Sequence, residues 1–110
     1  MSRPTPADLL QGTLDLLILR TLELGPRHGW AIAKRIEEVS RDALTINQGS
    51  LYPALYRLED QGWISAEWGV ASGRRAKFYT LSAAGKRQLG EEAREWRAFT
   101  AAVELVLKGT

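Results

Sequence analysis

Apolar residues follow helical spacing in several stretches of the chain. The first stretch runs from Ala7 or Asp8 to the Gly25-Pro26 pair and is so rich in leucine that few polar positions remain. A Gly-Pro pair is a strong helix stop, because glycine tolerates the left-handed closing residue and proline cannot continue the helix. Since apolar residues cover most of its circumference, we expect this helix to be buried on two sides, by the domain core and by a partner subunit.

A second helix is predicted for residues 29–40, where apolar residues recur at helical spacing with charged residues opposite them. Trp30 belongs to this apolar stripe and Trp63 to a later apolar stretch, so we expect both indole rings to pack in the core. His28, the only histidine, stands directly before the helix. A contact in the turn or at the helix start explains it better than catalysis does.

A third helix follows, and two residues compete for its N-cap position. Asn47 and Ser50 are both good N-caps. Pro53 favours the start at Ser50, because proline then falls in the first turn, where its missing N–H costs little. A start at Asn47 would place Pro53 inside the helix and bend it. Gly62 occupies the place of a left-handed residue that ends a helix.

Residues 63–68 and 76–81 alternate along the chain, which predicts the two strands of a hairpin. Gly69 and Gly73 bound the segment between them, so we expect a flexible connection of moderate length rather than a tight two-residue turn. A helix followed by a basic hairpin is the arrangement with which a winged helix-turn-helix holds DNA.

Ser82 is a good cap for a last helix over residues 83–107. Apolar residues occupy its heptad positions, with Leu89, Trp96 and Val103 seven apart and Phe99 and Val106 seven apart. This is the seam of a coiled coil. A helix of this length overhangs a small core, so we expect its distal half to pack against a second copy of the chain.

The order of elements is therefore helix, helix, helix, strand, strand, helix. It predicts a mainly α fold with a small β-hairpin, a winged helix-turn-helix followed by a long C-terminal helix. We expect three parts: a flexible arm at residues 1–7, a winged-helix DNA-binding domain at 8–81 and a dimerisation helix at 82–110.

Composition narrows the functional classes. The chain has 110 residues and no cysteine, which excludes disulfides and thiolate metal sites. We see no signal peptide and no apolar run that could span a bilayer, and we expect a cytoplasmic protein. Common catalytic and nucleotide-binding motifs are missing as well. We therefore expect no catalytic residues, no metal site, no cofactor and no enzymatic activity.

The hairpin carries a local positive charge on a nearly neutral chain. Fifteen Lys and Arg against thirteen Asp and Glu give a net charge of +2, which by itself is too weak to indicate nucleic acid. Arg74, Arg75 and Lys77, however, lie together with no acid between Trp68 and Leu81. Attraction to phosphate requires such a cluster. A solvated loop is the plain alternative.

The third helix supplies the other half of the predicted DNA site. Arg57 is the strongest single candidate, because its guanidinium can pair bidentately with guanine or contact phosphate. Tyr52 and Tyr56 either position phosphates or simply pack on the hairpin. The candidate DNA-binding residues are Lys34, Gln48, Ser50, Tyr52, Pro53, Tyr56, Arg57, Arg74, Arg75 and Lys77.

The surplus apolar surfaces of the first and last helices predict a homodimer. The candidate interface residues are Leu10, Leu14, Leu17, Leu89, Trp96, Phe99, Val103 and Val106. Two copies of Trp96 would approach each other across the seam, and facing indole rings form an apolar slot that could hold a flat aromatic ligand. Interface packing alone is the simpler alternative for Trp96.

Three segments resemble the PadR family of transcriptional regulators. They are LLQGTLDLLILRTLELGPRHGWAIAKRIEE at 9–38, GSLYPALYRLEDQGWI at 49–64 and GRRAKFYTLSAAGKRQL at 73–89. The middle segment is the most specific, with LYPAL followed by RLE and a Gly-aromatic-Ile turn. Trp30 replaces the more usual Tyr, and Ala76 and Phe78 depart from the usual wing.

The resemblance implies a winged-helix homodimer that binds a partly palindromic operator and usually represses. It places the recognition helix at residues 50–61 and the wing at 69–77. Some short members bind flat aromatic compounds between subunits, at a residue that aligns with Trp96. The chain ends at Thr110, as expected of a short form with a single C-terminal helix. The alternative function is a winged-helix protein-interaction module without DNA binding.

Overall fold

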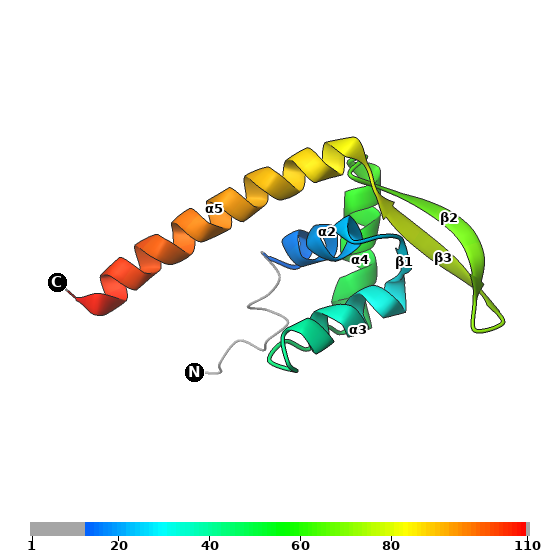
Figure 1. Ribbon diagram of the computed structural model, residues 1–110, viewed down its shortest axis with the longest axis horizontal. Helices are drawn as coiled ribbons and strands as arrows, with labels where there is room; N and C mark the ends of the chain where they lie inside the picture. Colours follow the sequence, from blue (N-terminus) through cyan, green and yellow to red (C-terminus); the bar gives the residue numbers. More distant parts are fainter. Residues whose placement is uncertain (1–12, 110) are drawn as a thin grey trace.

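A long helix extends from a small helical domain with a three-stranded sheet (Figure 1). The computed structural model describes residues 13–109. The elements in chain order are α2 (Leu14–Glu23), β1 (Arg27–His28), α3 (Gly29–Val39), α4 (Gln48–Asp60), β2 (Ile64–Ala71), β3 (Arg74–Leu81) and α5 (Ala83–Lys108). The described part contains no helix with the length and apolar character of a membrane span. The predicted winged-helix fold with a long C-terminal helix is confirmed.

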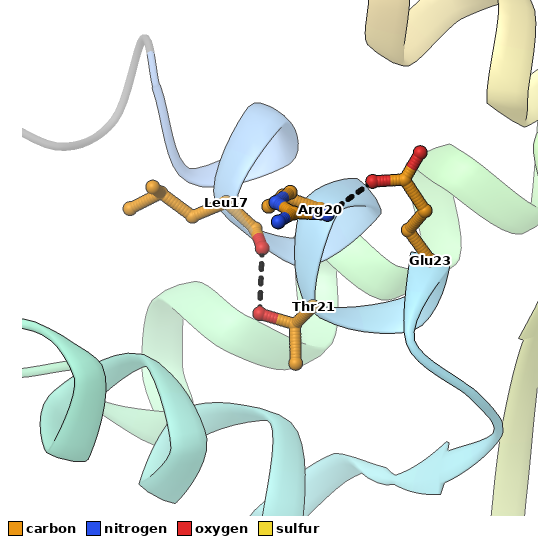
Figure 2. Close-up of polar contacts among 4 residues, drawn as sticks. All are labelled: Leu17, Arg20, Thr21 and Glu23. Atoms are coloured by element: carbon orange, nitrogen blue, oxygen red, sulfur yellow. Dashed lines mark hydrogen bonds and ion pairs between the residues drawn. The ribbon is translucent and has the colours of Figure 1, made fainter.

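Helix α2 lies at the centre of the domain and contacts α3, α4, α5 and β3. Ile18 and Leu19 are fully buried. Thr21 is also buried, and its hydroxyl donates a hydrogen bond of 2.8 Å to the Leu17 carbonyl, while Arg20 pairs with Glu23 on the exposed side (Figure 2). Much of the leucine-rich surface of α2 is therefore covered within one protomer.

Helix α3 begins where the sequence predicts. The His28 side chain accepts a hydrogen bond of 3.3 Å from the Ala31 backbone N–H through its Nδ1 atom, so it caps the helix. This confirms the helix-start role of His28. The prediction that Trp30 packs in the core is wrong, because this side chain is 55% exposed. Its ring stacks on His28 instead, with centroids 6.3 Å apart.

Helix α4 starts at Gln48, so the preference for a start at Ser50 is wrong. The Asn47 side chain accepts a hydrogen bond of 2.9 Å from the Ser50 N–H and caps the helix. Pro53 therefore lies inside the helix and cannot donate to the carbonyl of Gly49. Gly49 is exposed, so water can serve that carbonyl.

The carboxyl end of α4 is closed by Gly62, as the sequence predicts. Gly62 has a φ of +77°, and the N–H of Trp63 donates to the Leu58 carbonyl at 3.0 Å. This hydrogen bond is typical of a glycine-terminated helix. The Trp63 side chain is half-buried and packs against the core, as expected.

The sheet has the order β1-β3-β2 and is antiparallel throughout. The predicted hairpin is present, but both strands are longer than expected, and Ala71 pairs with Arg74. The connection is thus a tight two-residue turn, Ser72-Gly73, with φ values of +52° and +74°. The prediction of a longer, flexible connection is wrong. The two-residue strand β1 was not predicted.

Helix α5 is capped as expected, by the Ser82 hydroxyl, which accepts from the Gly85 N–H at 3.0 Å. Gly85 packs directly against the backbone between α4 and β2, because a Cβ there would lie 1.9 Å from the Trp63 carbonyl oxygen. Leu89 is buried in the core of the same protomer. Beyond Thr100, all described residues of α5 are exposed.

Candidate nucleic-acid interface

Helix α4 has one buried and one exposed face. The residues of the buried face are Leu51, Ala54, Leu55 and Leu58. The exposed residues of its first three turns are Gln48, Gly49, Tyr52, Pro53, Tyr56 and Arg57. The amino end of a helix carries unpaired N–H groups and the positive end of the helix dipole, and both favour anions. The exposed face of α4 therefore presents polar and aromatic groups next to an anion-friendly helix end.

The cations of the wing lie on β3, beside this face. Arg74 and Arg75 are exposed, and Arg75 lies over the Trp68 ring with its guanidinium carbon 4.4 Å from the ring centroid. Lys77 is half-buried, and its Nζ atom lies 3.4 Å from the Glu59 carboxylate of α4. The two arginines therefore project into solvent, whereas Lys77 connects the wing to the helix.

Strand pairing explains which side chains face α4. Side chains alternate between the two faces of a strand, and directly opposed residues share a face. Tyr79 is buried against the core, so Arg75 and Lys77, four and two residues before it, lie on the same face. Trp68 pairs with Lys77 across the two strands, so its side chain lies on the same face. The wing thus turns its basic and aromatic face toward α4.

The tyrosines of α4 occupy the space between these elements. Tyr52 packs against α3, because a Cβ on Gly29 would lie 3.0 Å from its ring. Tyr56 is 61% exposed, and the Lys77 Nζ lies 5.8 Å from its ring centroid. Burial raises the pKa of the Tyr79 phenol above its ordinary value, and the Glu59 carboxylate adds to this shift. The Tyr79 hydroxyl therefore stays protonated at neutral pH.

Arg57 contacts a residue of another helix. It lies in the last turns of α4, and its guanidinium donates a hydrogen bond of 2.9 Å to the Asp15 carboxylate of α2. A guanidinium held this way is directed toward α2 and away from the wing. Its role as the main base-contacting residue stays a prediction, and in the structure Arg57 joins α2 to α4.

The remaining predicted DNA-binding residues are divided between α3 and α4. Lys34 is exposed on α3, with its Nζ 4.9 Å from the centroid of the Trp30 ring. Ser50 is half-buried in the first turn of α4, next to the exposed Gln48. The structure therefore brings Tyr52 and Tyr56 together with the wing residues Arg75 and Lys77 around one cleft, whereas Arg57 contacts Asp15 of α2.

Two aromatic residues of this side were not predicted as site residues. Trp30 and Trp68 are 55% and 61% exposed, and each has a cation over its ring. The strand pattern contains a signal for Trp68, because an indole that lies opposite a lysine on the neighbouring strand is well placed for a cation–π contact. Helical spacing contains no such signal for Trp30.

The predicted dimer residues divide into two groups. Leu14 and Leu89 are 4% and 6% exposed and belong to the core of one protomer, so they have little surface left for a partner. Leu17 is half-buried, and Leu10 lies outside the described residues. The exposed apolar residues of the predicted seam are Trp96, Phe99, Val103 and Val106.

Sequence comparison supports a regulatory role. The profile of the transcriptional regulator PadR-like family matches residues 18–91, from α2 into the first third of α5. An uncharacterized protein of Lysinibacillus sphaericus is 31% identical over 104 residues, 94% of this chain and 95% of that one. A transcriptional regulator of Mycobacterium tuberculosis is 38% identical over 58 residues, 53% of this chain and 54% of that one.

Solved structures share the fold. A transcriptional regulator from Clostridium thermocellum has a TM-score of 0.81 at 27% identity and covers 88% of this chain and 95% of its own. A PadR family transcriptional regulator from Eggerthella lenta has a TM-score of 0.78 at 30% identity, with 93% and 88% covered. Because these two structures cover 88% and 93% of this chain, the similarity includes much of α5. The chain belongs to the PadR-like family of transcriptional regulators.

Proposed function

We propose that the protein acts in the cytoplasm as a homodimeric repressor that binds a partly palindromic operator. The observation that carries this proposal is that the exposed α4 residues Tyr52 and Tyr56 and the exposed wing residue Arg75 line one cleft, with Arg74 exposed next to Arg75 in the chain. A recognition helix contacts base edges from its first turns, and wing cations contact phosphate. We assign Gln48 and Tyr52 to the helix contacts.

Helix α5 supports the pairing of two chains. Its 26 residues span about 39 Å, and the seam residues Phe99 and Val106 are 62% and 79% exposed. A second copy of the same helix would cover this apolar stripe by coiled-coil packing. Residues 82–110 would then be the dimerisation element of the protein, with residues up to 81 as the DNA-binding domain. A symmetric pair would present two recognition helices to successive half-sites of the operator.

An aromatic effector between the two chains would act on this pairing. Trp96 is 43% exposed and lies beside Phe99, with ring centroids 6.3 Å apart and planes tilted by 40°. In a dimer, both rings and their symmetry mates would border one apolar slot. A flat ligand in that slot would change the spacing of the two winged helices and release the operator. Quenching of tryptophan fluorescence by a planar aromatic compound, lost in Trp96→Ala, would support this slot.

Titration of labelled duplexes from the upstream region of the coding sequence tests DNA binding. If each winged helix neutralises about three phosphates, the log–log dependence of affinity on salt has a slope of about −5 for the dimer. Binding should be retained in Arg87→Ala, which removes an exposed arginine of α5. Absence of salt-dependent binding to any fragment would instead favour a protein-interaction module.

A further inference from the structure

The cations of the domain are held in two different ways. In residues 13–109, some of them lie against a carboxylate, which neutralises their charge. These ion pairs are Arg20–Glu23, Arg35–Glu38, Arg57–Asp15 and Lys77–Glu59. Two other cations lie over an indole ring instead, Lys34 over Trp30 and Arg75 over Trp68. A ring holds a cation and leaves its charge available, so these two can still attract an anion.

The strand register places Arg75 on the Trp68 ring. The tight turn Ser72-Gly73 fixes the pairing of β2 with β3 up to the tip of the wing. Trp68 pairs with Lys77, so Arg75 is its diagonal neighbour on the same face, within reach of a large ring and a long side chain. The guanidinium carbon lies 4.4 Å from the ring centroid. Arg74 lies on the opposite face of β3, so the indole serves only one of the two wing arginines.

The indole of Trp68 contributes little to the core of the domain. It is 61% exposed, whereas the core consists of buried aliphatic residues and Tyr79. Together with Arg75, Trp68 lines a cleft of about 380 Å³ between the start of α3, the tyrosines of α4 and the wing. The Arg75 guanidinium is therefore held beside the exposed side of α4, where DNA would lie on the recognition helix.

A long side chain loses rotamer freedom when it binds, and that loss weakens the affinity. Arg75 is exposed, and no ion pair within residues 13–109 includes it. Contact with the indole restricts this side chain before DNA arrives. A carboxylate in the place of Trp68 would restrict it as well, but would compete with phosphate for the same N–H groups. The ring therefore suits an arginine that has to be both ordered and charged.

We propose that Trp68 is a positioning residue for DNA binding, which holds the Arg75 guanidinium so that it meets a phosphate of the operator beside α4. The guanidinium keeps its charge and donates N–H groups to the phosphate oxygens. Trp68 acts through Arg75 and does not itself contact DNA. This role rests on the proposed function, whereas the contact between Trp68 and Arg75 in the free protein does not.

Nuclear spin relaxation of the arginine Nε–H signals tests that contact in the free full-length protein. Arg74→Gln and Arg75→Gln assign the two wing signals. We expect the Arg75 signal to be more ordered than the Arg74 signal, to lose this order in Trp68→Leu, and to keep most of it in Trp68→Phe, which retains a ring face. The proposal is overturned if Arg75 is as mobile as Arg74 in the wild type, or if Trp68→Leu leaves its order unchanged.

A double-mutant cycle on DNA binding separates positioning from direct contact. Trp68→Leu should weaken binding of the labelled duplex about fivefold per wing, because Arg75 must then be ordered on binding. The salt slope should stay the same, since no charge is lost, whereas Arg75→Gln should reduce it by about 1 per wing. Trp68→Phe should restore most of the affinity. In the Arg75→Gln background, Trp68→Leu should have no further effect.

Two results of this cycle would overturn the proposal. If Trp68→Leu binds DNA as tightly as the wild type, the indole does not position Arg75. If it weakens binding equally with and without Arg75, the indole contacts DNA itself or shapes the wing as a whole. Because Trp68 is exposed, we expect an unchanged thermal melt for each variant.

Trp30→Leu is the matched control for the cycle. Trp30 is a comparably exposed indole of the same cleft, at 55%, but the cation over its ring is Lys34. Its effect on binding should be the same with and without Arg75, and a coupling as strong as that of Trp68 would overturn the assignment. If the wild type binds no duplex, the proposed function fails and the DNA role of Trp68 with it. The relaxation measurement then still decides whether Trp68 holds Arg75.

Discussion

The molecule exposes aromatic rings in two regions whose neighbours differ. In the cleft beside the wing, Trp30 and Trp68 each have a cation over the ring. On α5, Trp96 and Phe99 continue into an apolar stripe through Val103. Exposed aromatic surface therefore indicates two kinds of partner here. Rings with cations suit the phosphates of nucleic acid, and rings in an apolar stripe suit a second apolar stripe.

The same contrast separates the winged-helix domain from the distal half of α5. The domain buries its leucine-rich α2 among four other elements, and the most distal core residue on α5 is Leu89. Beyond it, the side chains of α5 find few partners in the chain itself. The domain should therefore fold alone, while the seam depends on association. The following predictions test this division, from the largest expected effect to the smallest.

Phe99→Glu should have the largest effect. A carboxylate in the apolar centre of a helix pair would cost about 3 kcal/mol, more than a hundredfold in the dimer dissociation constant. Ala101→Glu is the matched control, because it adds the same charge at the f position, away from the a/d seam. Sedimentation equilibrium measures both. A Phe99→Glu protein that remains as dimeric as Ala101→Glu would refute the seam.

Gly85→Ala tests the junction between the two regions. The added Cβ would lie 1.9 Å from the Trp63 carbonyl oxygen, so the start of α5 must shift. We expect a loss of about 2 kcal/mol in the free energy of unfolding, despite the better helix propensity of alanine. Gly90→Ala, where the nearest atom is 3.6 Å away, should gain about 0.5 kcal/mol. Urea unfolding followed by circular dichroism measures the free energy of unfolding of both variants. Equal values for Gly85→Ala and Gly90→Ala would contradict the tight packing at Gly85.

Arg74→Ala should weaken DNA binding without affecting the dimer. Loss of one phosphate contact per wing lowers affinity for all duplex sequences alike, by about 1 kcal/mol per wing, and reduces the salt slope by about 1 per lost contact. The control is Arg87→Ala, an exposed arginine of α5. Anisotropy titrations at several salt concentrations measure both. An unchanged slope in Arg74→Ala would remove this arginine from the interface.

The Arg57–Asp15 ion pair should give the smallest effect. Arg57 is about half exposed, so a double-mutant cycle with Arg57→Ala and Asp15→Ala should give a coupling of about 0.2–1 kcal/mol that falls with added salt. Sequence preference on DNA should not change. If Arg57→Ala instead relaxes the preference at one base pair by about 1–3 kcal/mol, Arg57 leaves Asp15 to contact that base.

Local signals in the sequence suffice for most of the fold. The caps Ser82 and His28 and the terminator Gly62 act within a few residues of themselves, and each occupies its predicted place. Gly69 was predicted to begin the connection between the two strands of the hairpin, and this was wrong. It lies inside β2, where the Phe78 ring covers it, and a Cβ at this position would lie only 2.9 Å from that ring. This contact comes from the partner strand.

The candidate site was less predictable, because its contacts join distant parts of the chain. Arg57 pairs with Asp15, 42 residues away, and no local sequence pattern predicts that ion pair. Trp30 has the spacing of a core residue, yet the second residue of α3 points toward the cleft beside the wing. Residue types led to the predicted DNA-facing elements, and only the packing of those elements showed which of their side chains are exposed and which contact other parts of the domain.

The number of chains on one operator duplex tests the central claim, that two winged helices joined by α5 form the DNA-binding unit. Sedimentation velocity with a labelled duplex measures this number for the wild type and for Phe99→Glu. We predict two chains per duplex for the wild type and much weaker, single-chain binding for the variant. A wild-type complex with one chain per duplex, or a variant that binds as tightly as the wild type, would contradict the account.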